Sequence, residues 1–222
     1  MKIIKRMTPV VSVMLIIITF AAPNAFADTV VAGDWIKLYD AGIGTTNGGP
    51  FSLFKNNVYQ FDTFCLETNE YFTPGSAIYV AGVSKEAVNG GSGGGSPDPI
   101  SEETAYLYYH FRIGDLGALT AGAFQYNNAG ADALQTAIWK FEQEVGYTTV
   151  NNYLVTLANN ALPLDRQIAY ANVWVLNLTD GPISQVKKQD QLTYIPVPEP
   201  ATLLLLGLGL AGLGFSSRKL KK

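Results

Sequence analysis

The pattern of apolar and polar positions changes along the chain from a period of about two to a period of about 3.6. Between residues 28 and 87, short runs alternate or are rich in aromatic and β-branched side chains, which is typical of strands. These runs cover residues 35–39, 58–66 and 77–81, and the turn sequence Asn47-Gly48-Gly49-Pro50 follows the first of them. The segment is therefore predicted to be mainly β.

A Gly/Ser-rich stretch at 88–101 separates this β segment from a mainly helical one at 102–162. Acidic residues after Ser101 indicate a helix start before 105–113, residues 132–145 place their apolar side chains on one face, and 150–161 is predicted to form a third helix. The run 168–178 is predicted to return as a strand to the first sheet. The expected fold class is α+β, a β-sheet or sandwich framework with an inserted helical segment.

Both ends of the chain carry the features of targeting segments. Residues 1–27 combine a basic start, an apolar run and Ala25-Phe26-Ala27, the pattern of a secretory signal peptide. At the other end, Pro198-Glu199-Pro200 precedes the mostly apolar residues 201–215 and then a basic cluster. A helix over 201–215 is short for a bilayer but is predicted to anchor the chain in the membrane transiently, with the basic end in the cytoplasm.

The order of these three C-terminal parts resembles the sorting signal of the PEP-CTERM proteins of Gram-negative bacteria. The resemblance covers residues 197–222 and implies that an exosortase-type enzyme recognises Pro198, Glu199 and Pro200 and removes the tail. It also implies a destination at the cell surface, in the outer membrane or in the extracellular matrix of a biofilm. The body between the targeting segments is expected to be a single domain at 28–196.

Charge separates this body from the ends. The whole chain has a net charge of −3, but residues 28–197 hold 8 basic and 17 acidic side chains, a balance of −9. Such a body repels phosphates, so a nucleic-acid partner is excluded. One cysteine and one histidine cannot make a closed structural zinc site, and no motif indicates a cofactor, so neither a metal nor a cofactor is predicted.

Cys65 is the only cysteine of an exported chain, and it is inert, paired with another chain or chemically used. Phe64-Cys65-Leu66 and Gln135-Thr136-Ala137-Ile138-Trp139 resemble the paired motifs of bacterial thioester domains, in which a Cys–Gln thioester joins a strand to a helix. The resemblance implies that Cys65 supplies the thiol and Gln135 the acyl group. Trp139, one helical turn after Gln135, and Phe64 are expected to shield the bond.

The leading hypothesis is thus an adhesin that couples once to an amine on a surface or matrix partner, and not a turnover enzyme. Glu67, Glu142 and His110 are candidate proton shuttles. The chain has three close carboxylate pairs, Glu67/Glu70, Glu102/Glu103 and Glu142/Glu144. As pairs they are interpreted as solvated surface charge. Two alternatives stay open: a structural exopolysaccharide-matrix protein with an inert Cys65, and a cysteine hydrolase that uses Cys65 and His110.

Overall fold

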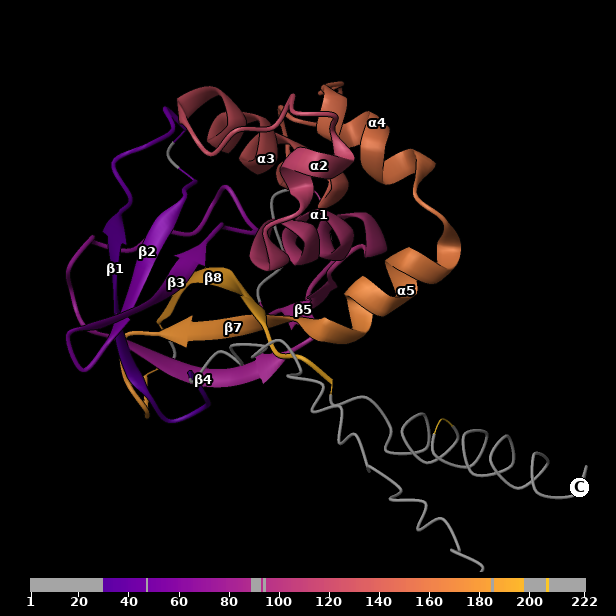
Figure 1. The fold of residues 1–222 in the computed structure, drawn as a ribbon. Coiled ribbons are helices and arrows are strands. Elements are labelled where there is room, and N and C mark those ends of the chain that lie inside the picture. Colours follow the sequence, from indigo (N-terminus) through magenta and orange to yellow (C-terminus); the bar gives the residue numbers. More distant parts are fainter. Residues whose placement is uncertain are drawn as a thin grey trace, which may run out of the picture.

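A computed structural model describes residues 30–46, 48–88, 93, 95–184, 186–197 and 207. Within them the chain is a mixed α+β fold, as predicted, with a mainly antiparallel sheet and five helices. Figure 1 shows the helices gathered on one side of the sheet, with α1 nearest the strands. The predicted signal peptide and the predicted membrane helix at 201–215 lie outside the described residues, apart from Gly207.

The framework is one six-stranded sheet with the strand order β3-β2-β1-β4-β7-β8. Its edges meet, because the chain just after β3 continues along β8: Cys65 lies opposite Gln191, and the Leu192 N–H donates to the Phe64 carbonyl at 3.2 Å. A sheet closed on itself leaves few unpaired edge groups. The six strands are β1 (Trp35–Asp40), β2 (Phe51–Lys55), β3 (Val58–Thr63), β4 (Ile78–Ser84), β7 (Val173–Thr179) and β8 (Lys187–Tyr194).

The five helices named for the described residues lie between the early strands and β7 in the chain, which is the predicted insertion. Ser101, Asn127 and Asn152 cap the N-termini of three of them with side-chain oxygens, as their residue types favour. The helices are α1 (Glu102–Ile113), α2 (Leu116–Leu119), α3 (Asn128–Phe141), α4 (Tyr153–Asn160) and α5 (Pro163–Asn172).

Most of the buried apolar residues that the structure describes form two clusters. One is enclosed by the sheet and contains Leu38, Leu53 and Cys65, while the other lies between the sheet and the helices and contains Phe64 and Leu134. Neighbouring residues of an extended chain point to opposite faces, which explains why Phe64 and Cys65 belong to different clusters. The segment after β3 therefore contributes to both cores.

Three predicted boundaries change. Residues 168–172 are helical and not part of the returning strand, because α5 begins at Pro163 and continues to Asn172, and Arg166 on α5 pairs with Glu103 on α1 at 2.8 Å. The predicted helix at 132–145 is α3, which begins four residues earlier and ends at Phe141. The predicted loop at 88–101 contains the short strand β6 (Asp98–Pro99), which pairs with β5 (Glu86–Ala87).

Candidate functional site

Cys65 and Gln135 lie against each other in the interior, and both are fully buried. The Gln135 amide pairs with the cysteine backbone on both sides: the Cys65 N–H donates to Oε1 at 3.2 Å, and Nε2 donates to the Cys65 carbonyl at 2.9 Å. Strand pairing with β8 positions the cysteine, and α3 positions the glutamine. The two motifs, 70 positions apart, are thus brought together.

The sulfur of Cys65 faces a third buried side chain. Gln191 on β8 donates from Nε2 to Sγ at 3.1 Å. Burial raises the pKa of the Cys65 thiol well above its ordinary value, the Gln191 hydrogen bond acts in the opposite direction, and the nearby charge of Glu67 raises the pKa further. Burial thus favours the neutral thiol over the thiolate at this position.

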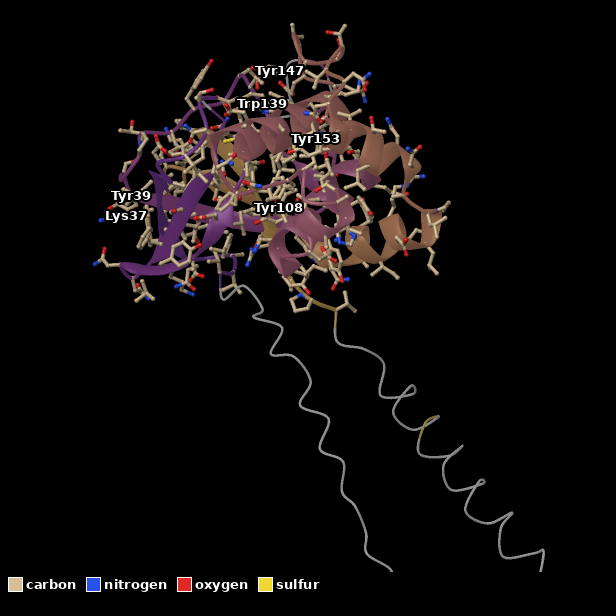
Figure 2. The ribbon with its side chains drawn as sticks, turned by 45° about the horizontal axis from the view of Figure 1, so that its top comes forward. Lys37, Tyr39, Tyr108, Trp139, Tyr147 and Tyr153 are labelled. Atoms are coloured by element: carbon tan, nitrogen blue, oxygen red, sulfur yellow. The ribbon has the colours of Figure 1, made fainter. Side chains whose placement is uncertain are left out.

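A tight loop covers the Gln135 amide. A Cβ atom added at Gly48 would lie 2.8 Å from Gln135 Cδ and 2.1 Å from the Trp139 ring, so only glycine fits there. Trp139 is buried, and its ring centroid is 4.5 Å from that of Tyr147; Figure 2 shows the two side chains next to each other at one end of the molecule. Gly48 thus lies against both Trp139 and Gln135.

The same loop is fixed to α3 by one carboxylate. Asp132 accepts hydrogen bonds from Thr45 N at 2.6 Å, Thr45 Oγ1 at 2.6 Å and Thr46 N at 3.1 Å. Partial burial raises the pKa of Asp132, but these hydrogen bonds outweigh it and lower the pKa overall. The helix that carries Gln135 thus also holds the loop that covers it.

A cavity of about 210 Å³ lies on the outer side of this loop. Gly49, Pro50, Tyr71 and Gln189 are among its lining residues. A Cβ atom at Gly49 would lie 3.4 Å from Gln135 Oε1, so this glycine lies between the cavity and the amide. The cavity and the Gln135 amide therefore share Gly49 as a neighbour.

Two further predicted residues, Phe64 and His110, make contacts away from the sulfur. Phe64 packs on Phe111 in the helical cluster, with ring centroids 5.3 Å apart. His110 binds Asp115 through Nδ1 at 2.8 Å and contacts Tyr106 and Tyr109. In the described part of the chain neither side chain has a hydrogen bond with Cys65 or Gln135.

Glu142 has a structural contact of its own. Its Oε1 accepts hydrogen bonds from Ser101 Oγ at 2.8 Å and Ser101 N at 3.2 Å, which ties the end of α3 to the start of α1. Burial raises the pKa of Glu142 to about 7, against the effect of these hydrogen bonds.

The prediction that the carboxylate pairs are surface charge is wrong for two of the three pairs. Glu67, Glu70, Glu142 and Glu144 are all buried, because the chain after β3 and the chain after α3 fold inward. Glu144 accepts hydrogen bonds from the Thr68 N–H and hydroxyl. Only Glu102 and Glu103 are partly exposed, where they face Arg166.

Sequence reasoning missed the residues of β8 that reach this region: Gln189, Asp190 and Gln191. All three are buried, and Gln189 donates to the Glu67 carbonyl at 2.7 Å. Their polar run gave no apolar alternation to mark a strand. The only feature of the sequence that could have indicated buried polar residues here is the run Gln-Asp-Gln, which lies directly before Leu192 and close to Tyr194.

Comparison with known proteins identifies the C-terminus. Residues 196–219 match the PEP-CTERM protein-sorting motif, which confirms that part of the sequence resemblance. The motif indicates export, processing by an exosortase-type enzyme and a destination at the cell surface or outside the cell. No curated protein and no solved structure matches the chain.

The sorting residues Pro198, Glu199 and Pro200 lie outside the described residues. Among the residues that the structure does describe, no helix has the length and apolarity needed to cross a membrane.

Proposed function

We propose that the protein is an exported surface or matrix protein in which Cys65 and Gln135 form an internal thioester that couples covalently to an amine on a partner. The observation that carries the proposal is the buried Gln135 amide, held by both the N–H and the carbonyl of Cys65. Sγ belongs to the same residue as these two groups, and attack on Gln135 Cδ requires the sulfur to lie within reach of that carbon. Positioning of this kind supplies effective molarities of about 10⁵ to 10⁸ M.

The bond-forming step balances without a cofactor. Sγ attacks Gln135 Cδ, the new S–C bond replaces the bond from Cδ to Nε2, and the thiol proton leaves with the nitrogen as ammonia. In the second step a partner amine attacks Cδ, an amide forms, and sulfur leaves as the thiol with a proton from the amine. Each molecule reacts once, so the chain is not a turnover enzyme.

Two contacts favour the first step. Negative charge develops on Oε1 as sulfur attacks, and the Cys65 N–H already donates to that atom at 3.2 Å. The Gln191 amide donates to Sγ at 3.1 Å and stabilises the thiolate that must form transiently in a buried place. Gln191 is thus a positioning residue that the sequence motifs do not contain.

Protection from water is the second requirement, because hydrolysis destroys a thioester. Gly48 and Trp139 enclose Gln135 Cδ, and Asp132 holds the loop closed. The cavity beyond Gly49 is the proposed approach for the amine. The acidic balance of the body, −9 over residues 28–197, favours a cationic partner such as a lysine side chain.

Intact-mass measurement of the full exported chain, purified beside Cys65→Ala and Gln135→Glu, tests the proposal. The wild type should be about 17 Da lighter than calculated, the mass of one ammonia, with no titratable thiol after denaturation. Methylamine should restore the thiol and label Gln135, and both variants should show neither effect. A full calculated mass with one titratable thiol contradicts the proposal, provided that the increase of about 1 Da from hydrolysis of Gln135 to Glu is absent.

That contradicting result would favour the second candidate, a structural matrix protein in which Cys65 is an inert core residue. The supporting observation is that Cys65 packs in the apolar cluster inside the sheet and that burial raises its thiol pKa. A cysteine hydrolase predicts turnover that is lost on His110→Ala. The contacts of His110 with Asp115, Tyr106 and Tyr109 give this third alternative no support.

A further inference from the structure

Three carboxylates converge where the segment after β3 meets β8. Glu67, Glu70 and Asp190 are 1%, 8% and 2% exposed, and each offers an oxygen atom within 4.8 Å of those of the other two. Three carboxylates this close repel one another, and burial removes the water that would screen the repulsion. The cluster therefore requires either protons or a cation.

The unpaired carboxylate of Glu67 favours a cation over protons. Both of its carboxylate oxygens are buried and have no hydrogen-bond partner among the described residues, although buried polar groups are nearly always paired. The charged groups that face it are Asp190, Glu70 and Glu144. The site thus holds an acceptor-rich side chain that the protein itself does not satisfy.

The carboxylate of Asp190 is held in place by three hydrogen bonds. One of its oxygens accepts from Leu178 N at 2.8 Å, and the other accepts from Val88 N at 3.0 Å and Asn177 Nδ2 at 3.1 Å. These bonds orient the carboxylate on β8 before any ion arrives. Preorganised oxygen ligands lower the cost of binding a cation.

The donor set selects the ion. Carboxylate oxygens alone suit a hard cation, and a zinc site would need nitrogen or sulfur ligands. Two ligands on opposite sides of one Ca²⁺ ion at about 2.4 Å are at most about 4.8 Å apart, whereas Mg²⁺, at about 2.1 Å, needs a tighter set. We propose that Glu67, Glu70 and Asp190 form a calcium site that ties the segment after β3 to β8.

The proposal differs from the expectation that the chain binds no metal. That expectation came from counting cysteine and histidine ligands, which does not detect an oxygen-only site. The site does not depend on the thioester, although the ion would fix the segment that carries Cys65. Calcium should therefore bind to Cys65→Ala as it does to the wild type.

Calcium titration of the full chain in detergent micelles tests the site. With a dissociation constant of about 0.1 to 1 mM, typical of extracellular calcium modules, about 10 mM calcium should lower the unfolding equilibrium constant roughly 10- to 100-fold. Equilibrium dialysis with calcium alone should give one ion per chain, and magnesium should have the smaller effect.

Glu67→Gln is the decisive variant, because it keeps the shape of the side chain and removes its charge. It should abolish the calcium response, whereas Glu102→Gln on the surface of α1 should keep it. If Glu67→Gln does not fold, Glu70→Gln provides the same comparison. A wild type without a calcium response, or a variant that responds equally, overturns the proposal, and the result for Cys65→Ala separates this outcome from a failure of the thioester.

Discussion

Buried polar side chains make the contacts that join distant segments of this protein. Gln135 binds the backbone of Cys65, Gln191 binds its sulfur, and Asp190 binds the backbone of β7. Each would cost free energy in the interior if it were left without a partner. At the residue scale, these pairs specify which segments meet, while the apolar clusters supply most of the driving force.

Glu142 provides a test of this view through pH. Its pKa is raised to about 7 by burial, so the folded state holds the proton more tightly than the unfolded chain does. Its contribution to stability is complete below pH 4.5 and is lost as the pH rises to about 7. Glu142→Gln keeps an oxygen acceptor for Ser101 but does not titrate, so it should gain up to about 3 kcal/mol relative to the wild type between pH 4 and 8.

Urea unfolding of both chains across this pH range measures the difference directly. The difference isolates one group, because the other carboxylates are common to both chains. A gap between the two curves that does not change with pH would show that the pKa of Glu142 is the same in the folded and the unfolded chain.

At the scale of elements, α3 both positions a residue of the proposed site and holds the loop that covers that residue. It carries Gln135, and through Asp132 it holds the loop at 44–46. Asp132→Ala removes three hydrogen bonds to a charged acceptor and should destabilise the fold by about 1 to 2 kcal/mol, since the site is partly exposed. Hydrogen exchange at the Thr45 and Thr46 amides should accelerate, and any thioester should hydrolyse faster.

Asp180→Ala, at an exposed turn, is the matched control and should leave the exchange of both amides unchanged. Unchanged exchange in Asp132→Ala would mean that the loop is held by its other contacts, such as that of Gly44 N with Asn128 Oδ1 at 3.1 Å.

The sequence predicted those elements whose apolar residues are buried and whose polar residues are exposed. It did not predict elements that bury polar residues. The strand before Cys65 and the amphipathic α3 carry the residue patterns of a strand and a helix, so the sequence indicated both of them. The meeting of Cys65 with Gln135 was implied only by the resemblance to thioester domains, because it depends on how the helices pack on the sheet. β8 turns Gln189, Asp190 and Gln191 into the interior, where their partners come from β7 and the chain after β3. No local pattern reveals partners that only the tertiary fold supplies.

α5 shows a second reason for failure. Ile168 and Tyr170 resemble the start of the strand that follows, but Pro163 favours the first turn of a helix and Arg166 pairs with α1.

The burial of the carboxylates at 67, 70 and 144 was not predicted, because their partners, like those of β8, come from distant parts of the chain. A charged residue in a sequence is expected at the surface unless a partner or an ion is known.

At the scale of the whole molecule, a Cys65–Gln135 thioester would join the sheet to the helical insertion. The bond closes a loop of about 70 residues, and the chain-entropy estimate for such a cross-link is a stabilisation of roughly 4 kcal/mol as an upper figure. The full chain should therefore unfold at a lower guanidinium concentration after methylamine has opened the bond. The slope of the free energy with denaturant should rise as well, because the unfolded chain without the cross-link exposes more surface.

Cys65→Ala separates this effect from a direct effect of methylamine, because it has no bond to open and its unfolding midpoint should not move. Equal midpoints for the intact and the opened wild type would mean that strain in the closed ring offsets the entropy gain. A midpoint that falls only in the wild type would mean that coupling to a partner also releases the sheet from the helices. Capture of an amine would then break the covalent link between the sheet and the helical insertion in the same step that attaches the partner to α3.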